Sequence, residues 1–144
     1  MVWRKAGVYD TSPRCKDKVY KLIMTAKKTL VLGASENPAR YSNLAVKKLI
    51  ANSHPVIALG KKKGSIGNII IETEKKYFKN IDTITLYLNP SHQQEYYHYI
   101  FSLHPKRIIF NPGTENHELT ELAKQKGIAT QDACTLVLLS TNQY

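Results

Sequence analysis

Short apolar runs alternate along the chain with longer stretches in which apolar residues recur every three or four positions. The short runs occupy 30–32, 56–59, 83–88, 107–110 and 128–130. Runs of this length, bounded by turn residues, are typical of strands, and helical spacing between them is typical of crossover helices. The alternation predicts an α/β domain with a doubly wound, mostly parallel five-stranded sheet and helices on both faces.

Spacing and capping residues predict the helices. After the first strand, helical spacing is shown by Tyr41, Leu44, Ala45, Leu49 and Ile50. This stripe is expected to pack on the sheet. Asn89 and Pro90 form a favourable cap and first-turn pair for a helix that runs to Leu103, and Gly127 closes the helix that contains Leu119.

Two segments leave their structure open. The segment that follows the second strand contains Gly67-Asn68 and Ile69–Ile71, which indicates either a loop or a short hairpin. The stretch 134–139 is compatible with a helix or a strand. No internal repeat or low-complexity tract is present.

Composition narrows the class of protein. The 144 residues are 42% hydrophobic and 22% charged, which fits one soluble globular domain, and no apolar run approaches the roughly 20 residues that a membrane span requires. Cys15 and Cys134 match no zinc or Cys-x-x-Cys spacing, so a reducing, cytoplasmic location is expected. The five histidines show no spacing of the kind used by metal sites on helices.

The net charge of +10 is high for this length and favours anionic partners. Nucleic acid, a membrane surface and a phosphorylated small molecule are all anionic, so the charge alone does not choose among them. Nucleic acid is disfavoured because no recognised binding motif occurs. The aromatic helix that contains Tyr96 and Tyr99 is better explained by core packing or by a face that joins copies in a homo-oligomer.

Residues 1–23 differ from the remainder of the chain. They are basic, and no helical or strand period is sustained across them. They lack the apolar core and the cleavage site of a secretory signal. Met24 directly precedes a segment suited to the start of a domain, so we expect a domain over 24–144 and a poorly ordered extension over 1–23. A functional basic arm is the alternative.

The first strand is followed by Gly33-Ala34-Ser35 and then by a helix, which is the layout of a phosphate cradle. Small side chains admit a ligand close to the backbone, and the first amides of a helix favour an anion. Arg40 is placed to add a charge-assisted hydrogen bond. The turn is not G-x-G-x-x-G, so a plain strand-to-helix turn with a solvated Arg40 is an equal alternative.

Ligands of wound sheets bind at the edge formed by the carboxyl ends of the strands. Four turns of this chain are expected to meet there, at 33–35, 60–61, 88–90 and 111–114. Without regard to its position, the lysine run that begins at Lys61 is most simply interpreted as a turn exposed to solvent. Their place after the second strand favours contact with a phosphorylated ribose, because an NAD site would carry an acidic residue at this point.

These motifs, taken together, resemble the CoA-binding domain family. This Rossmann-like module also forms the nucleotide-binding part of the succinyl-CoA synthetase α subunit. The opening pattern Gly-x-Ser-x-x-Pro-x-Arg-Tyr is matched by residues 33–41. Residues 82–90, 105–116 and 134–137 resemble the corresponding segments of a branch of small stand-alone members of this family. The resemblance extends from Lys27 to Ser140.

The resemblance implies a set of cofactor-binding residues. Gly33, Ala34, Ser35 and Arg40 would hold the pyrophosphate of CoA, and Lys61 and Lys62 would face its phosphorylated ribose. Asn89 and Asn111 would line the pantetheine side. Tyr41, from the opening motif, and Gly113, from the turn after Asn111, complete the set.

A CoA-binding or acyl-CoA-binding protein without catalytic activity of its own is therefore the first functional hypothesis. The larger enzymes that the chain resembles require a domain with a phosphorylatable histidine and a grasp domain, and neither is found in this sequence. The alternative is a small NADP-binding oxidoreductase. The sequence contains no Tyr-x-x-x-Lys pair, and no acid and base residues have a spacing that would place them together for catalysis, which disfavours this alternative.

Overall fold

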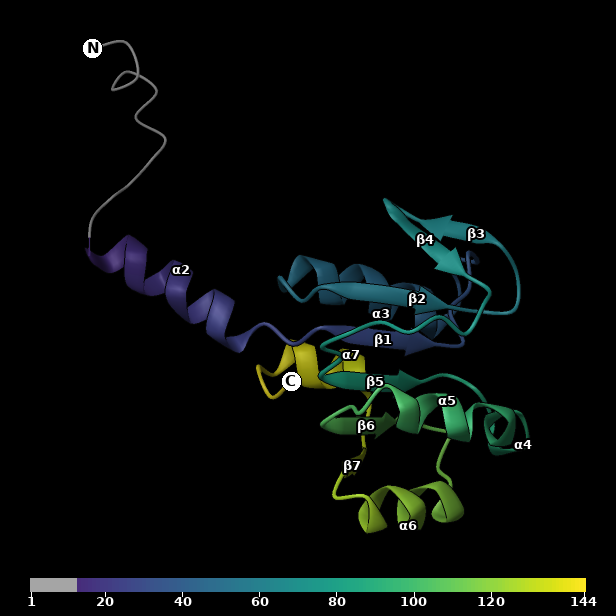
Figure 1. The fold of residues 1–144 in the computed structure, drawn as a ribbon. Coiled ribbons are helices and arrows are strands. Elements are labelled where there is room, and N and C mark those ends of the chain that lie inside the picture. Colours follow the sequence, from purple (N-terminus) through teal and green to yellow (C-terminus); the bar gives the residue numbers. More distant parts are fainter. Residues whose placement is uncertain (1–12) are drawn as a thin grey trace.

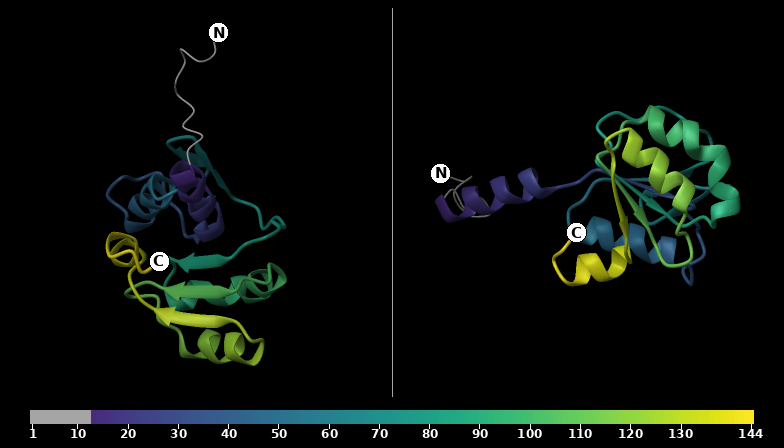
Figure 2. Two further views of the ribbon diagram at one scale, coloured as in Figure 1. Left: turned by 90° about the vertical axis from the view of Figure 1, so that its left-hand side faces the viewer. Right: turned by 90° about the horizontal axis from the view of Figure 1, so that it is seen from below.

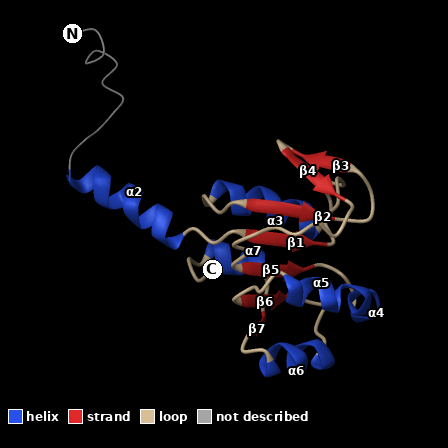
Figure 3. Ribbon diagram, in the orientation of Figure 1, coloured by secondary structure: helices blue, strands red, loops and turns tan. Residues whose placement is uncertain are grey.

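The structure is a computed structural model, and it describes residues 13–144. Its strands are β1 (Thr29–Leu32), β2 (Val56–Leu59), β3 (Gly64–Ile66), β4 (Ile69–Glu72), β5 (Thr83–Leu86), β6 (Arg107–Phe110) and β7 (Ala129–Asp132). They form one sheet in the order β3-β4-β2-β1-β5-β6-β7 (Figures 1 and 3). All neighbouring pairs are parallel except β3 with β4.

The mostly parallel α/β sheet is confirmed, but the expected count of five strands is wrong. The additional two strands, β3 and β4, form an antiparallel hairpin with Gly67 in its turn at a φ of +59°. These strands have three and four residues, and Gly64, Gly67 and Asn68 are turn-forming residues that leave a loop as an equal interpretation. Of the two structures left open for this segment, the hairpin is the one observed.

Helices cover both faces of the sheet. One face carries α3 (Tyr41–Ala51) and α7 (Thr135–Ser140), and the other carries α5 (Tyr97–Ser102) and α6 (His117–Gln125) (Figure 2). The sequence of the segment 134–139 was compatible with a helix or a strand, and the structure shows that most of it belongs to helix α7. Two layers of helices around one sheet bury the strands on both sides, which explains their nearly continuous apolar runs.

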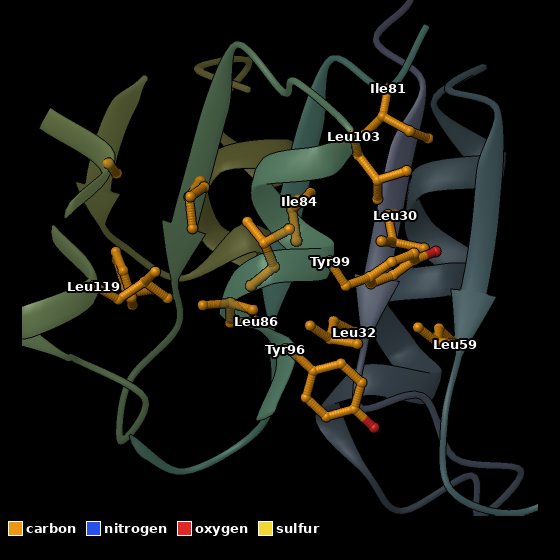
Figure 4. Close-up of a cluster of buried hydrophobic side chains, with 14 residues drawn as sticks. Leu30, Leu32, Leu59, Ile81, Ile84, Leu86, Tyr96, Tyr99, Leu103 and Leu119 are labelled. Carbon is orange, nitrogen blue, oxygen red and sulfur yellow. The ribbon is translucent and has the colours of Figure 1, made fainter. Parts of the chain in front are cut away.

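Strand periodicity divides the core between the two faces. Leu30 and Leu32 join a cluster that includes Tyr99 and Leu119, on the side of α5 and α6 (Figure 4). Val31 lies between them in sequence and packs in the other cluster, on the side of α3. Successive residues of a strand point to opposite faces, so four residues of β1 serve both cores.

The buried face of α3 differs from the expected stripe. Tyr41, Leu44 and Ile50 are exposed. The buried positions are Ser42, Asn43, Ala45, Val46 and Leu49. Small and polar residues fill part of this face because α3 begins directly beside the turn after β1, where the Asn43 side-chain amide donates to the Ser35 carbonyl at 3.0 Å.

The helix expected from Asn89 to Leu103 is divided into α4 (Pro90–Gln93), the 3₁₀ turn η1 (Gln94–Tyr96) and α5. Its start is confirmed, because the Asn89 side chain accepts a hydrogen bond from the amide of His92. The Gln93 amide is buried and donates to two backbone carbonyls, of Leu88 and Thr114, at 2.7 Å each. These bonds fix the turn after β5 to the turn after β6.

The basic extension differs from its expectation over part of its length. Residues 13–25 form helix α2 (Pro13–Thr25), which points away from the sheet in Figure 1. Pro13 occupies the first helical position, where a missing N–H costs nothing. The apolar residues Val19 and Ile23 are one helical turn apart but are exposed, so this local pattern lacks a partner in the domain. Residues 1–12 lie outside the described part of the chain.

The edge of the sheet opposite the carboxyl ends of the strands is closed by Tyr144. Its hydroxyl lies 2.6 Å from the Thr29 hydroxyl, and its ring lies 4.5 Å from the Arg107 guanidinium and 4.8 Å from the His54 ring. Burial, together with the nearby charges of Lys27 and Arg107, lowers the pKa of His54 below its ordinary value.

Candidate functional site

A cleft of about 820 Å³ opens at the carboxyl ends of the strands. It lies where the strand order reverses, because β1 has β2 on one side and β5 on the other. Crevices at such switch points are the usual ligand sites of wound sheets. The lining residues come from four turns and are Gly33, Ala34, Ser35, Glu36, Asn37, Pro38, Arg40, Tyr41, Ser42, Lys61, Lys62, Lys63, Tyr87, Leu88, Pro112 and Thr114.

The turn after β1 is held close to its neighbours on both sides. Gly33 has a φ of +98°, and a Cβ atom there would lie 3.0 Å from the backbone carbonyl of Tyr87. The amides of Gly33 and Ala34 both donate to the Leu59 carbonyl, at 2.8 and 2.9 Å. These two amides are therefore used by the fold, and the two residues contribute space for a ligand rather than hydrogen-bond donors.

The N-terminus of α3 faces the same cleft. Arg40 occupies its N-cap position, makes no capping hydrogen bond with its side chain, and no acidic residue follows in the first turn. Within the described chain, the backbone amides of Tyr41 and Ser42 have no hydrogen-bond partner. An exposed helix start with free amides carries a partial positive charge, which suits an anion.

Four basic side chains line the cleft, those of Arg40, Lys61, Lys62 and Lys63. The one ion pair among the described residues joins Lys76 to Glu72, which are outside the cleft. The four cleft cations are therefore free to pair with a ligand. Glu36 is the single acidic residue of the lining, and its carboxylate accepts a hydrogen bond from the amide of Ser65.

The structure thus brings together seven of the predicted cofactor-binding residues. These are Gly33, Ala34, Ser35, Arg40, Tyr41, Lys61 and Lys62. The other three are placed differently. Asn89 caps α4, and Gly113 is exposed with its amide bonded to the Glu115 carboxylate at 2.8 Å. Neither residue lines the cleft.

Asn111 is the clearest departure, because it is buried at 3% exposure and is not among the residues that line the cleft. Its amide nitrogen donates to the Thr85 hydroxyl at 2.6 Å and to the Leu86 carbonyl at 2.9 Å. Its oxygen accepts from the Thr135 amide at 2.9 Å. Both N–H groups and one lone pair of the oxygen are therefore used within the fold, and Asn111 is not among the residues that line the cleft.

Several cleft residues were not predicted. Lys63 continues the lysine run and was recognisable from its neighbours. Tyr87 and Leu88 reach the cleft because β5 ends before them, two residues earlier than the apolar run indicated. Burial raises the pKa of the Tyr87 hydroxyl, and the nearby hydroxyls of Thr135 and Thr85 partly oppose this shift.

Other classes of site find little support in the described residues. Within 13–144, no three histidine, cysteine, aspartate or glutamate side chains are grouped so as to hold a metal ion. The helices in that range are also too short or too polar to span a bilayer.

Comparison with known proteins identifies the family and the fold of the chain. A family model described as a CoA binding domain matches residues 27–140. A crystal structure of an uncharacterized protein is 46% identical, with a TM-score of 0.82 over 83% of this chain and 99% of that one. No curated protein is similar enough to match.

Two more distant structures share the fold. A protein from Thermus thermophilus is 17% identical, with a TM-score of 0.74 over 89% of this chain and 98% of its own. A hypothetical protein from Pyrococcus horikoshii is 19% identical, with the same TM-score over 93% and 98%. At these identities the likeness shows the α/β architecture alone.

Proposed function

The chain belongs to the CoA-binding domain family, and from this premise we propose that it binds CoA or an acyl-CoA in the cleft at the carboxyl edge of the sheet. One observation carries the proposal. Four unpaired basic side chains and the uncapped N-terminus of α3 converge on a single cleft. CoA carries a diphosphate and a phosphorylated ribose, which require this concentration of positive charge.

The diphosphate is assigned to the N-terminus of α3. The free amides of Tyr41 and Ser42 supply donors, and the Arg40 guanidinium adds a charge-assisted pair. Gly33 and Ala34 support this arrangement by leaving the space above the turn free of side chains. This division of roles refines the expectation that residues 33–35 themselves hold the diphosphate.

The phosphorylated ribose is assigned to Lys61 and Lys62. A phosphate on the ribose is shared by CoA and NADP, so these lysines also suit the second candidate, an NADP-binding protein. The family match favours CoA. Direct competition between the two ligands decides between them.

We also propose that the domain binds its ligand without transforming it, in the cytoplasm. Within the part of the chain that the structure describes, the lining contains one carboxylate, on Glu36, and no histidine or cysteine that could act with it as an acid or a nucleophile. The test is incubation with acetyl-CoA followed by mass spectrometry. Hydrolysis or acyl transfer above the buffer rate, abolished by a substitution in the cleft, would contradict this part of the proposal.

The principal test is isothermal titration of the full chain with CoA, acetyl-CoA, NADP and NAD. Arg40→Ala removes one charge-assisted hydrogen bond, worth about 1.5–3 kcal/mol, and is expected to weaken CoA binding by roughly 10- to 100-fold. Lys47→Ala is the matched control, because it removes an exposed positive charge from α3 outside the cleft lining. It is expected to change affinity by less than about twofold.

Three outcomes would overturn the assignment. Binding of NADP without CoA would replace the ligand. An equal loss of CoA affinity in Arg40→Ala and Lys47→Ala would mean that the effect comes from the net charge of the protein and not from a contact with Arg40. Unchanged affinity in Arg40→Ala would remove the diphosphate from the start of α3.

A further inference from the structure

The lysine run of the cleft lies between two glycines that both pack against the turn after β1. Gly60 precedes Lys61 at the end of β2, and Gly64 follows Lys63 at the start of β3. Neither glycine has a positive φ. Their backbone conformations are therefore open to other residues, and the two positions differ in what an added Cβ atom would meet, which is fixed backbone at Gly60 and the movable end of the Glu36 side chain at Gly64.

The contact at Gly60 is with backbone. A Cβ atom there would lie 2.3 Å from the carbonyl oxygen of Ala34. A backbone carbonyl is unable to swing aside, and the Ala34 amide is already bonded to Leu59. This contact fixes where the lysine run begins.

The contact at Gly64 is with the side chain of Glu36. A Cβ atom there would lie 2.7 Å from Glu36 Oε2 and 3.0 Å from Cδ. The same oxygen accepts a hydrogen bond from the Ser65 amide at 3.3 Å. The carboxylate of this exposed side chain therefore contacts the hairpin backbone where the lysine run ends, and a methyl group at Gly64 would displace it.

We propose that Glu36 and Gly64 form a clamp that positions Lys61–Lys63 over the cleft and so sets the preference for ligands that carry a phosphate on the ribose. The inference rests on the proposed function and deepens it. Glu36 acts through the lysines and is a positioning residue. Its carboxylate, although negative, strengthens the recognition of a phosphate because its hydrogen bond with the hairpin holds three cations in place.

A simple electrostatic role for Glu36 predicts the opposite result. A carboxylate in a cleft that binds anions would repel the ligand, so its removal would tighten binding. The clamp predicts that its removal weakens the recognition of the ribose phosphate. The sign of the change therefore separates the two explanations.

The experiment measures Kd for CoA and for dephospho-CoA, which lacks the ribose phosphate, and takes the ratio of the two. Glu36→Ala and Gly64→Ala are each expected to lower the preference for CoA by roughly fivefold or more, through loss of ordered charge pairs. Glu36→Gln keeps an oxygen for the Ser65 amide and is expected to retain the preference. Ser65→Ala is the matched control, because it keeps the backbone amide.

The double variant Glu36→Ala with Gly64→Ala tests whether the two residues form one unit. If they do, the combined loss is no larger than that of either single variant. Amide exchange at Ser65 without ligand gives an independent measure, with protection expected in the wild type and in Glu36→Gln and lost in Glu36→Ala. Should Gly64→Ala fail to fold, the Glu36 variants and the exchange measurement decide alone.

Each result is informative. Tighter CoA binding in Glu36→Ala, or an unchanged ratio in a variant that still binds CoA, overturns the clamp and leaves the proposed function intact. Absence of CoA binding by the wild type overturns the proposed function and the specificity role together, even if the Ser65 amide is protected. A lowered ratio that Glu36→Gln retains supports both.

Discussion

Substitution of Asn111 by alanine separates a structural role from a binding role at a residue that the family resemblance assigns to the ligand. The side chain joins β5, through Thr85 and Leu86, to the start of α7, through Thr135. It also supplies a hydrogen-bond acceptor at a helix start whose N-cap residue, Cys134, makes no capping bond with its side chain. Asn111→Ala removes all three hydrogen bonds.

The cost follows from burial. The Thr135 amide loses its partner in the interior, which costs about 1–3 kcal/mol, and the other two hydrogen bonds contribute about 1 kcal/mol each. The expected loss is therefore about 3–5 kcal/mol of unfolding free energy. With an m-value near 2 kcal/mol per molar urea, the unfolding midpoint falls by about 2 M.

The assay is urea unfolding followed by circular dichroism, together with CoA titration under native conditions. Asn89→Ala is the control, because it removes an exposed helix cap worth about 1 kcal/mol. A midpoint drop below about 0.5 M for Asn111→Ala, accompanied by a tenfold or larger loss of CoA affinity, would refute the structural role and restore the original ligand assignment.

Two further predictions concern the frame of the cleft and the opposite edge of the sheet. Gly33→Ala is expected to lower the unfolding free energy by about 1–3 kcal/mol, because the positive φ and the contact with Tyr87 both oppose a side chain; stability equal to that of the wild type in urea would contradict this. His54 accepts a hydrogen bond from the Lys27 amide through Nδ1, and its pKa is lowered. The unfolded chain then binds more protons below about pH 6.5, so stability is full above that pH and falls as the pH decreases. The slope is expected to be shallower in His54→Asn, and an equal slope in both proteins would count against it.

The α/β class and the positions of the main strands could be predicted from sequence because they depend on local properties. The short apolar runs, the Asn89-Pro90 cap and Gly127 are each recognisable within a few residues. The hairpin strands were left open as a hairpin or a loop, because Gly64, Gly67 and Asn68 interrupt the short apolar run that contains them. The expected stripe of α3 is confirmed at Ala45 and Leu49 and is wrong at Tyr41, Leu44 and Ile50. The burial of Asn43 depends in part on a hydrogen bond with Ser35, which lies outside the helix.

The cleft shows the same division. The sequence by itself determined which turns meet at the carboxyl edge, since parallel strands place those ends together, and it supplied the positive charge. Only the tertiary structure decided which groups remain free to bind. Pairing of β1 with β2 uses the amides of Gly33 and Ala34, and packing of α7 uses the side chain of Asn111. Such hydrogen bonds join residues far apart in the chain, and no local pattern records them.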